Sequence, residues 1–288
     1  MVKIETGFCR ADELESVQRQ FNQEFIYSKG RTIEVQHRFP GILDNPENIL
    51  VRRVAGEIVS ALAIKRFAWD TPTERYRAAM VGLVWTIPSM RAQGHAAATL
   101  DYLRLQLSRE QCDFAVLWTT QPTVYSGSGW IAADCGRYGV LPGKPGVYLE
   151  TPINRASTEK IQQIREAFSP MRVSRVRTDT FPLPPPAIQL KMLLEPDAYA
   201  IIGLARDNAY VFDINGAFNS LQSLWQKISR SGMHIHMNAA DGNPVNDWVN
   251  QMLQTNLPFK PLAMWQPMSK RAMKLNYASI YIPILDRL

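Results

Sequence analysis

The stretch at residues 82–98 constrains the fold most, because it joins an apolar run to a turn and then to a helix start. The apolar run is typical of a buried strand, and Pro88 ends it since proline has no N–H to donate to a neighbouring strand. Gly94 leaves the backbone without a Cβ, and a helix with regularly spaced leucines follows. Backbone N–H groups at a helix start bind anions, so the stretch predicts a phosphate or pyrophosphate site.

The composition limits the class of protein. A chain of 288 residues with 46% apolar residues can form two packed domains of ordinary size. The three cysteines form no closely spaced pair, which favours a reducing compartment. We see no signal peptide and no apolar run of about 18 residues, so we expect a cytoplasmic protein without a membrane partner. The net charge of +6 is spread without a dense basic run, which favours a solvated basic face over nucleic-acid binding.

The first half predicts an α+β fold, in which one mixed central sheet is flanked by helices. Ala55-Gly56 joins two apolar strands and indicates a hairpin. The segment 28–48 has little periodicity and is expected to be a long loop with a short helix. The expected strands are 1–9, 48–54, 57–69, 80–87, 114–118, 131–138 and 147–152, and the expected helices are 11–27, 94–109 and 124–127.

The second half repeats this order of elements after a helix at 157–168 and a proline-rich connector at 181–186. Residues 215–218 replace the proline and glycine turn, so the copy keeps the architecture and loses the anion site. We therefore expect two domains, 1–152 and 153–288, of which only the first carries an anion site. The expected strands are 188–194, 198–204, 208–214, 234–237, 261–268 and 277–285, and the expected helices are 218–229 and 245–253.

Two motifs in the first half resemble those of the Gcn5-related N-acetyltransferase (GNAT) superfamily. The first is V-x-T-x-P-x-x-R-x-x-G-x-A, which runs from Val84 to Ala96. The second is Y-x-x-x-G-[FW], which Tyr125, Gly129 and Trp130 match. The two-copy arrangement is similar to the enhanced-intracellular-survival type of acetyltransferase, whose chains are usually longer and carry an additional domain. The resemblance implies two GNAT-like domains, the second of them degenerate.

The resemblance also implies a reaction and a co-substrate. Acetyl-CoA would donate an acetyl group to a primary amine of a small molecule or peptide, which attacks the thioester directly; no metal is implied. The pyrophosphate would lie on the backbone N–H groups of Arg91 to Ala96, and the pantetheine arm would pair with the strand backbone like an added strand. The expected cofactor-binding residues are Val84, Thr86, Ile87, Arg91, Ala92, Gln93, Gly94, His95 and Ala96.

The catalytic groups are only partly indicated. Tyr125 corresponds to the tyrosine that in many GNAT members protonates the departing thiolate; the alternative is a tyrosine of the core. A strand N–H near Thr86 or Ile87 would stabilise the oxyanion. The general base stays open, because residues 80–88 contain no carboxylate. Water, the second half, the chain end and the loop carboxylates Asp44, Glu47 and Glu74 are the alternatives.

Other interpretations remain open beside this one. The missing strand carboxylate also fits a non-catalytic acyl-CoA-binding or regulatory module. Trp85 would line the acyl pocket or belong to the core of the opposite face. His234 and His236 alternate on a strand, so they form either a metal pair or an ordinary pair in the core or on the surface. A homodimer is compatible with the sequence.

Overall fold

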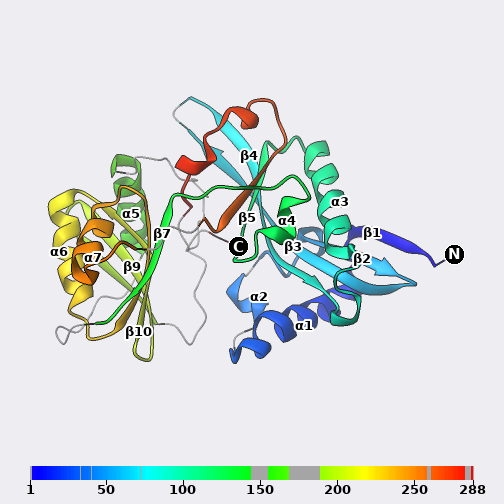
Figure 1. Cartoon of the computed structure of the whole chain (residues 1–288), viewed down its shortest axis with the longest axis horizontal. Helices are drawn as coiled ribbons and strands as arrows, with labels where there is room; N and C mark the ends of the chain where they lie inside the picture. The colour runs from blue at the N-terminus through cyan, green and yellow to red at the C-terminus, as the bar shows by residue number, and fades with distance from the viewer. Residues whose placement is uncertain are drawn as a thin grey trace.

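The computed structural model describes residues 2–143 except 33, 40 and 72, residues 155–168, 189–257 and 261–282, and residue 287. Two mixed sheets with helices on both faces lie side by side (Figure 1). The predicted α+β class with two sheets is thereby confirmed. No helix in the described part of the chain is long and apolar enough to cross a membrane.

The first sheet contains the stretch that opened the sequence analysis. Its strands run in the order β1-β2-β3-β4-β5-β12-β6. In the described part of this sheet, β4 and β5 are the parallel pair, and the other neighbouring strands pair antiparallel. The strand bounds are β1 Ile4–Phe8, β2 Ile49–Val54, β3 Glu57–Asp70, β4 Arg75–Thr86, β5 Phe114–Trp118, β12 Ala263–Pro267 and β6 Ile131–Ala132. The predicted β2–β3 hairpin is confirmed, and β5 has its predicted bounds.

Helices cover the two faces of the first sheet separately. On one face α3 (His95–Arg109) buries Leu100, Leu103 and Leu107 against β2–β5, as the leucine spacing predicts. The opposite face packs against α1 (Leu14–Phe25), which contributes Val17 and Phe21 to the core. Short helices lie in the segment 28–48, namely η2 Tyr27–Lys29, α2 Val35–Arg38 and η3 Pro46–Asn48.

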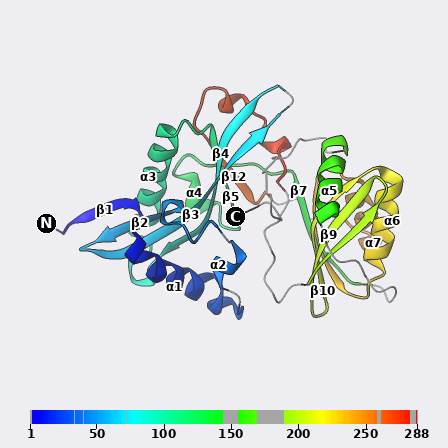
Figure 2. The same cartoon turned by 180° about the vertical axis from the view of Figure 1, so that it is seen from behind.

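The second sheet has the order β7-β11-β10-β9-β8. One face packs against α6 and α7, and the other packs against α5 (Figure 2). Its strands are β7 Gly136–Leu141, β8 Gln189–Glu195, β9 Ala198–Ala205, β10 Asn208–Gly216 and β11 His234–Ala240, and its helices are α5 Arg155–Phe168, α6 Phe218–Ser229 and α7 Pro244–Leu253. The predicted element order is thus found again, with α6 at its predicted bounds.

The two sheets exchange one strand each. β7 comes from the first half of the sequence but pairs with β11 in the second sheet. β12 comes from the second half but lies between β5 and β6 in the first sheet. A cut between residues 152 and 153 therefore divides both sheets, so the expected boundary does not coincide with the division between them.

The end of the chain differs from the prediction. Residues 277–285 were expected to form a strand, but 277–279 form a 3-10 helix and 280–282 join no sheet. The apolar pattern has another cause, since Tyr277 stacks on Trp265 with ring centroids 5.0 Å apart and covers the sheet. The expected strand at 147–152 and the proline-rich connector at 181–186 lie outside the described residues.

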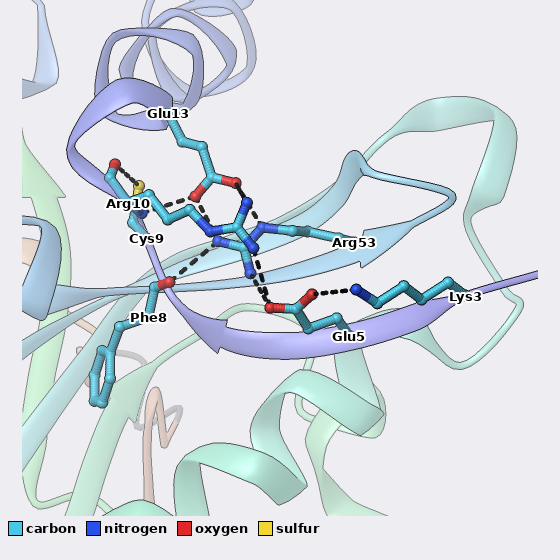
Figure 3. Close-up of polar contacts among 7 residues, drawn as sticks. All are labelled: Lys3, Glu5, Phe8, Cys9, Arg10, Glu13 and Arg53. Carbon is cyan, nitrogen blue, oxygen red and sulfur yellow. Dashed lines mark hydrogen bonds and ion pairs between the residues drawn. The ribbon is translucent and has the colours of Figure 1, made fainter.

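Buried ion pairs fix the start of α1 to the first sheet (Figure 3). Arg53 is 3% exposed, and its Nε donates to Glu13 Oε1 at 2.5 Å. The hydrogen bonds from Arg53 hold the pKa of Glu13 below its usual value despite partial burial. Arg10 Nη2 donates to Glu5 Oε1 at 3.2 Å.

Candidate functional site

The centre of the candidate site is the place where β4 and β5 diverge. The two strands pair in parallel only from Ala78–Phe114 to Met80–Val116. Beyond that point β4 continues to Thr86 and β5 continues to Trp118 without further pairing between them. The backbone of residues 81–86 therefore presents hydrogen-bonding groups on the side that β5 has left.

A β-bulge re-aims β4 within this divergence. The register against β3 shifts between Ala61 and Ala63, and Leu83 takes a left-handed φ of 52°. After the bulge Trp85 lies in the core beneath α1, at 4% exposure, whereas Val84 packs on the α3 face. Of the two interpretations for Trp85, the structure therefore supports the core on the opposite face.

The strand N–H groups at the end of β4 have different partners. Ile87 N–H donates to Val59 O at 2.9 Å, so this donor is already engaged. Successive residues of a strand direct their hydrogen-bonding groups to opposite sides, which turns the N–H of Thr86 away from β3 and toward the divergence. Thr86, and not Ile87, is thus the strand donor available to a ligand.

The turn that follows, residues 91–96, is here named the cradle. Ala92 and Gly94 have left-handed φ values of 61° and 80°, a conformation that gathers successive N–H groups on one side. Arg91 N–H donates to Pro88 O at 3.4 Å, so the free N–H groups begin at Ala92. A Cβ built on Gly94 would meet no atom within 4 Å, which means that the space over the turn is open. The cradle residues Arg91 to Gly94 are exposed, and His95 and Ala96 are half-buried.

The side chain of Arg91 bends back onto the fold. Its Nε donates to Thr86 O at 3.1 Å, and its Nη2 pairs with Glu24 Oε2 at 2.8 Å. Glu24 lies in the last turn of α1, whose first turn the Arg53 network fixes. Gln93 Nε2 donates to Ser89 O at 3.2 Å, which closes the turn. Sequence reasoning missed Glu24, because nothing in its local pattern relates it to a turn so far along the chain.

A second arginine lies beneath the helix start. Arg52 Nε donates to His95 Nδ1 at 3.2 Å, and its Nη1 donates to Thr6 Oγ1 at 2.8 Å. This geometry assigns the His95 proton to Nε2. Sequence reasoning also missed Arg52, because it belongs to β2, which lies two strands from β4 in the sheet.

Tyr125 lies in α4 (Thr123–Ser126) and packs against the α3-face core. Burial raises its pKa above the usual value of 10, so the hydroxyl keeps its proton at neutral pH. Within the described part of the chain the hydroxyl forms no hydrogen bond. A protonated, unengaged hydroxyl on this face can act as a general acid.

The loop carboxylates do not gather at the divergence. Glu74 precedes β4 and accepts from Tyr76, so it lies at the opposite end of the strand, about 35 Å from Thr86 along it. Glu47 lies beside Arg66, which pairs with Ala79 in the part of β4 that is still joined to β5. Asp44 is exposed and accepts from Gly41 N–H at 3.3 Å.

Two further features lie away from the divergence. A cavity of about 450 Å³ lies at the opposite end of β4 and β5, where Arg77, Asp113 and Arg271 line it. His236 bonds to Asn208 at 2.9 Å and stacks on Tyr210, which makes it part of the packing of the second sheet.

The second sheet has the same divergence in a closed form. β10 and β11 pair only from Asn208–His234 to Tyr210–His236, and β10 bulges between Val211 and Asp213. Ala217 alone separates β10 from α6, so no cradle is present. The Ile214 carbonyl accepts from Asn243 Nδ2 at 3.1 Å, which engages the backbone at the position equivalent to Val84. The predicted loss of the anion turn in the second half agrees with this geometry.

By fold and site, the chain is an α+β protein whose first sheet carries an open turn with left-handed residues beside two diverging parallel strands. Similar structures span most of the chain at low identity and show this fold. A conserved protein of Enterococcus faecalis V583, described as a probable N-acyltransferase, has a TM-score of 0.69 and 13% identity over 94% of this chain and 74% of its own. A GCN5-related N-acetyltransferase from Anabaena variabilis ATCC 29413 has a TM-score of 0.64 and 15% identity over 93% and 73%.

Eis1 from Mycobacterium abscessus is similar with a TM-score of 0.61 and 12% identity over 93% of this chain and 74% of its own. No curated protein sequence matches the chain. Residues 8–133 match the family described as "Acetyltransferase (GNAT) domain". This segment is therefore similar to GNAT acetyltransferase domains, and it covers the divergence, the cradle and Tyr125.

Proposed function

We propose that the protein is an acetyl-CoA-dependent N-acetyltransferase that acts on a primary amine of a small molecule or peptide. The observation that supports this most is the divergence of β4 and β5 directly beside the open cradle. Together they provide a free strand edge for an extended amide-bearing arm and free N–H groups for a pyrophosphate. Acetyl-CoA would supply the activated thioester, and no metal has a part in the proposal.

Each residue has a separate role in this proposal. The N–H groups from Ala92 to Ala96 bind the pyrophosphate, with the guanidinium of Arg91 beside them, and Val84 to Thr86 position the pantetheine arm. The N–H of Thr86 is the donor for the developing oxyanion. Tyr125 donates its proton to the departing sulfur from the α3 face. Holding the amine and the thioester together contributes up to about 7–11 kcal/mol of barrier lowering.

We assign no side chain of the first sheet as the general base. None of Asp44, Glu47 and Glu74 has a described contact that brings it to Thr86. Arg287 lies over the Trp118 ring at 4.9 Å, where β5 ends. Proton removal through water or through a group near this end of β5 fits the arrangement.

Two measurements test the proposal. Calorimetry should detect CoA binding to the full chain, and CoA release should be seen when acetyl-CoA is incubated with a panel of primary amines. A chain that binds no CoA would contradict the proposal.

A non-catalytic acyl-CoA-binding module is the second candidate, and the lack of a carboxylate in residues 80–88 of the strand favours it. It predicts CoA binding without release on any amine. It also predicts that Tyr125→Phe leaves every measured property of the complex unchanged.

A further inference from the structure

A buried indole beside Tyr125 has an unused hydrogen-bond donor. Trp130 is 4% exposed, and its Nε1 has no hydrogen-bond partner in the described part of the chain. Trp265, in contrast, is 1% exposed and donates from Nε1 to Ala133 O at 2.6 Å. The two buried indoles therefore differ in whether their donor is satisfied.

The surroundings of Trp130 connect it to the candidate site. Its ring meets the Tyr125 ring edge-on, with centroids 6.4 Å apart and planes at 71°. Both rings pack against the core that contains Leu117 of β5, and Val84 of β4 packs against the same core. Two polar groups without partners, one hydroxyl and one indole N–H, thus lie beside the strands that diverge.

An unsatisfied buried donor destabilises a fold, whereas an apolar ring of similar shape would not. The indole N–H can only donate, so its missing partner must be a hydrogen-bond acceptor. The pantetheine end of CoA offers two kinds of acceptor, the sulfur and the amide carbonyl oxygens.

We propose that the Trp130 N–H donates to an acceptor atom at the pantetheine end of CoA, beside Tyr125. Because Nε1 is buried in the free protein, the atoms that cover it must move aside when the arm binds. This inference rests on the proposed CoA binding. It adds a second hydrogen-bond donor beside Tyr125, the proposed general acid, on the α3 face of the sheet. Trp130 then contributes to ligand affinity through an N–H group that does not stabilise the free protein.

The test compares Trp130→Phe with Trp265→Phe, which both remove an indole N–H and similar volume. CoA should bind about five- to tenfold more weakly to Trp130→Phe. Trp265→Phe should bind CoA within twofold of the wild type and should unfold at a lower temperature than Trp130→Phe, because Ala133 O loses its donor. A Trp130→Phe affinity within twofold of the wild type would overturn the proposal, as would equal losses in both variants.

A measurement on the wild-type protein avoids any folding defect. In ¹H–¹⁵N spectra, CoA should shift the Trp130 indole resonance downfield and leave the Trp265 indole in place; an unmoved Trp130 resonance on saturation with CoA overturns the proposal. Desulfo-CoA distinguishes the two acceptors, since it keeps the shift if a carbonyl accepts and abolishes it if the sulfur accepts. Failure of the wild type to bind CoA at all would instead contradict the proposed function.

Discussion

The crossings from β4 to α3 and from β10 to α6 are two versions of one arrangement. Both follow three parallel residue pairs and both contain a bulge. The first then has the open cradle, whereas the second has one connecting residue and a backbone carbonyl engaged by Asn243. The difference teaches that divergent strands alone do not make a site, because a side chain can engage the same backbone groups.

The two crossings also differ in whether the strand before the helix carries a carboxylate. β4 has none near its bulge, but β10 carries Asp213, which is 4% exposed. Its carboxylate accepts from Arg165 Nε at 3.0 Å and from the Tyr199 hydroxyl at 2.6 Å. The second crossing therefore uses its carboxylate for stability, and the first crossing leaves its backbone free for a ligand.

The largest effect is expected from Asp213→Asn. It removes a negative charge that accepts from both Arg165 and the Tyr199 hydroxyl at a buried position, which should lower the free energy of unfolding by about 3 kcal/mol. Denaturant titration measures this loss. Asp241→Asn is the matched control, because its ion pair with Arg137 is largely exposed and should contribute less than about 1 kcal/mol. Equal losses in both variants would mean that Asp213 is not a structural carboxylate.

The glycines of the two crossings should differ next. A Cβ on Gly216 would lie 2.3 Å from Ala198 Cα, so Gly216→Ala should destabilise the fold by about 3 kcal/mol. Gly94→Ala meets no protein atom and should lose only about 1 kcal/mol from its left-handed backbone. Its main effect should be weaker CoA binding, measured by calorimetry. A Gly94→Ala variant with unchanged affinity would argue against close approach of a phosphate.

Tyr125→Phe should lower kcat by about 100-fold without changing CoA affinity. The acid must be protonated to act, so the wild-type rate should fall as pH rises through the raised pKa of Tyr125, above 10. This alkaline decline should disappear in the variant, as pH–rate profiles would reveal. Tyr102→Phe, which packs against the same core from α3, serves as the control and should keep the wild-type profile.

The smallest effect concerns the arginine of the cradle. Glu24→Gln removes the partner of Arg91 and frees its guanidinium for a phosphate, so CoA should bind about two- to threefold more tightly. The side chains of Arg91 and Glu24 are both more than a third exposed, so the free energy of unfolding should change little. Weaker binding in Glu24→Gln would indicate that the ion pair organises the cradle instead of competing with the ligand.

The sequence predicted those helices and strands well whose position follows from their own apolar pattern. The apolar runs of β2, β3 and β5 and the spacing in α3 and α6 determine those elements within a few residues. The exchange of β7 and β12 was not predictable, since an edge strand carries no local mark of the partner it will choose. Tyr277 and the residues after it show the same limit: their alternation comes from packing on Trp265 and not from a sheet.

The candidate site also has one part that the local sequence indicates and another part that only the fold brings together. The cradle lies within one contiguous stretch, so its glycine, proline and helix start were readable from the sequence. Glu24 and Arg52 reach it from α1 and β2, and only the fold brings them there. The engaged N–H of Ile87 depends on which side of β4 each residue faces, which the bulge at Leu83 sets.

The strand exchange also affects how the protein is made. During synthesis β5 leaves the ribosome long before β12, its neighbour in the first sheet, and β6 pairs only with β12. The first sheet therefore has an open edge at β5 until residue 267 has emerged, although all residues of the candidate site are already translated. Open edges promote pairing with other chains, so the nascent protein is exposed to such pairing until β12 has been added.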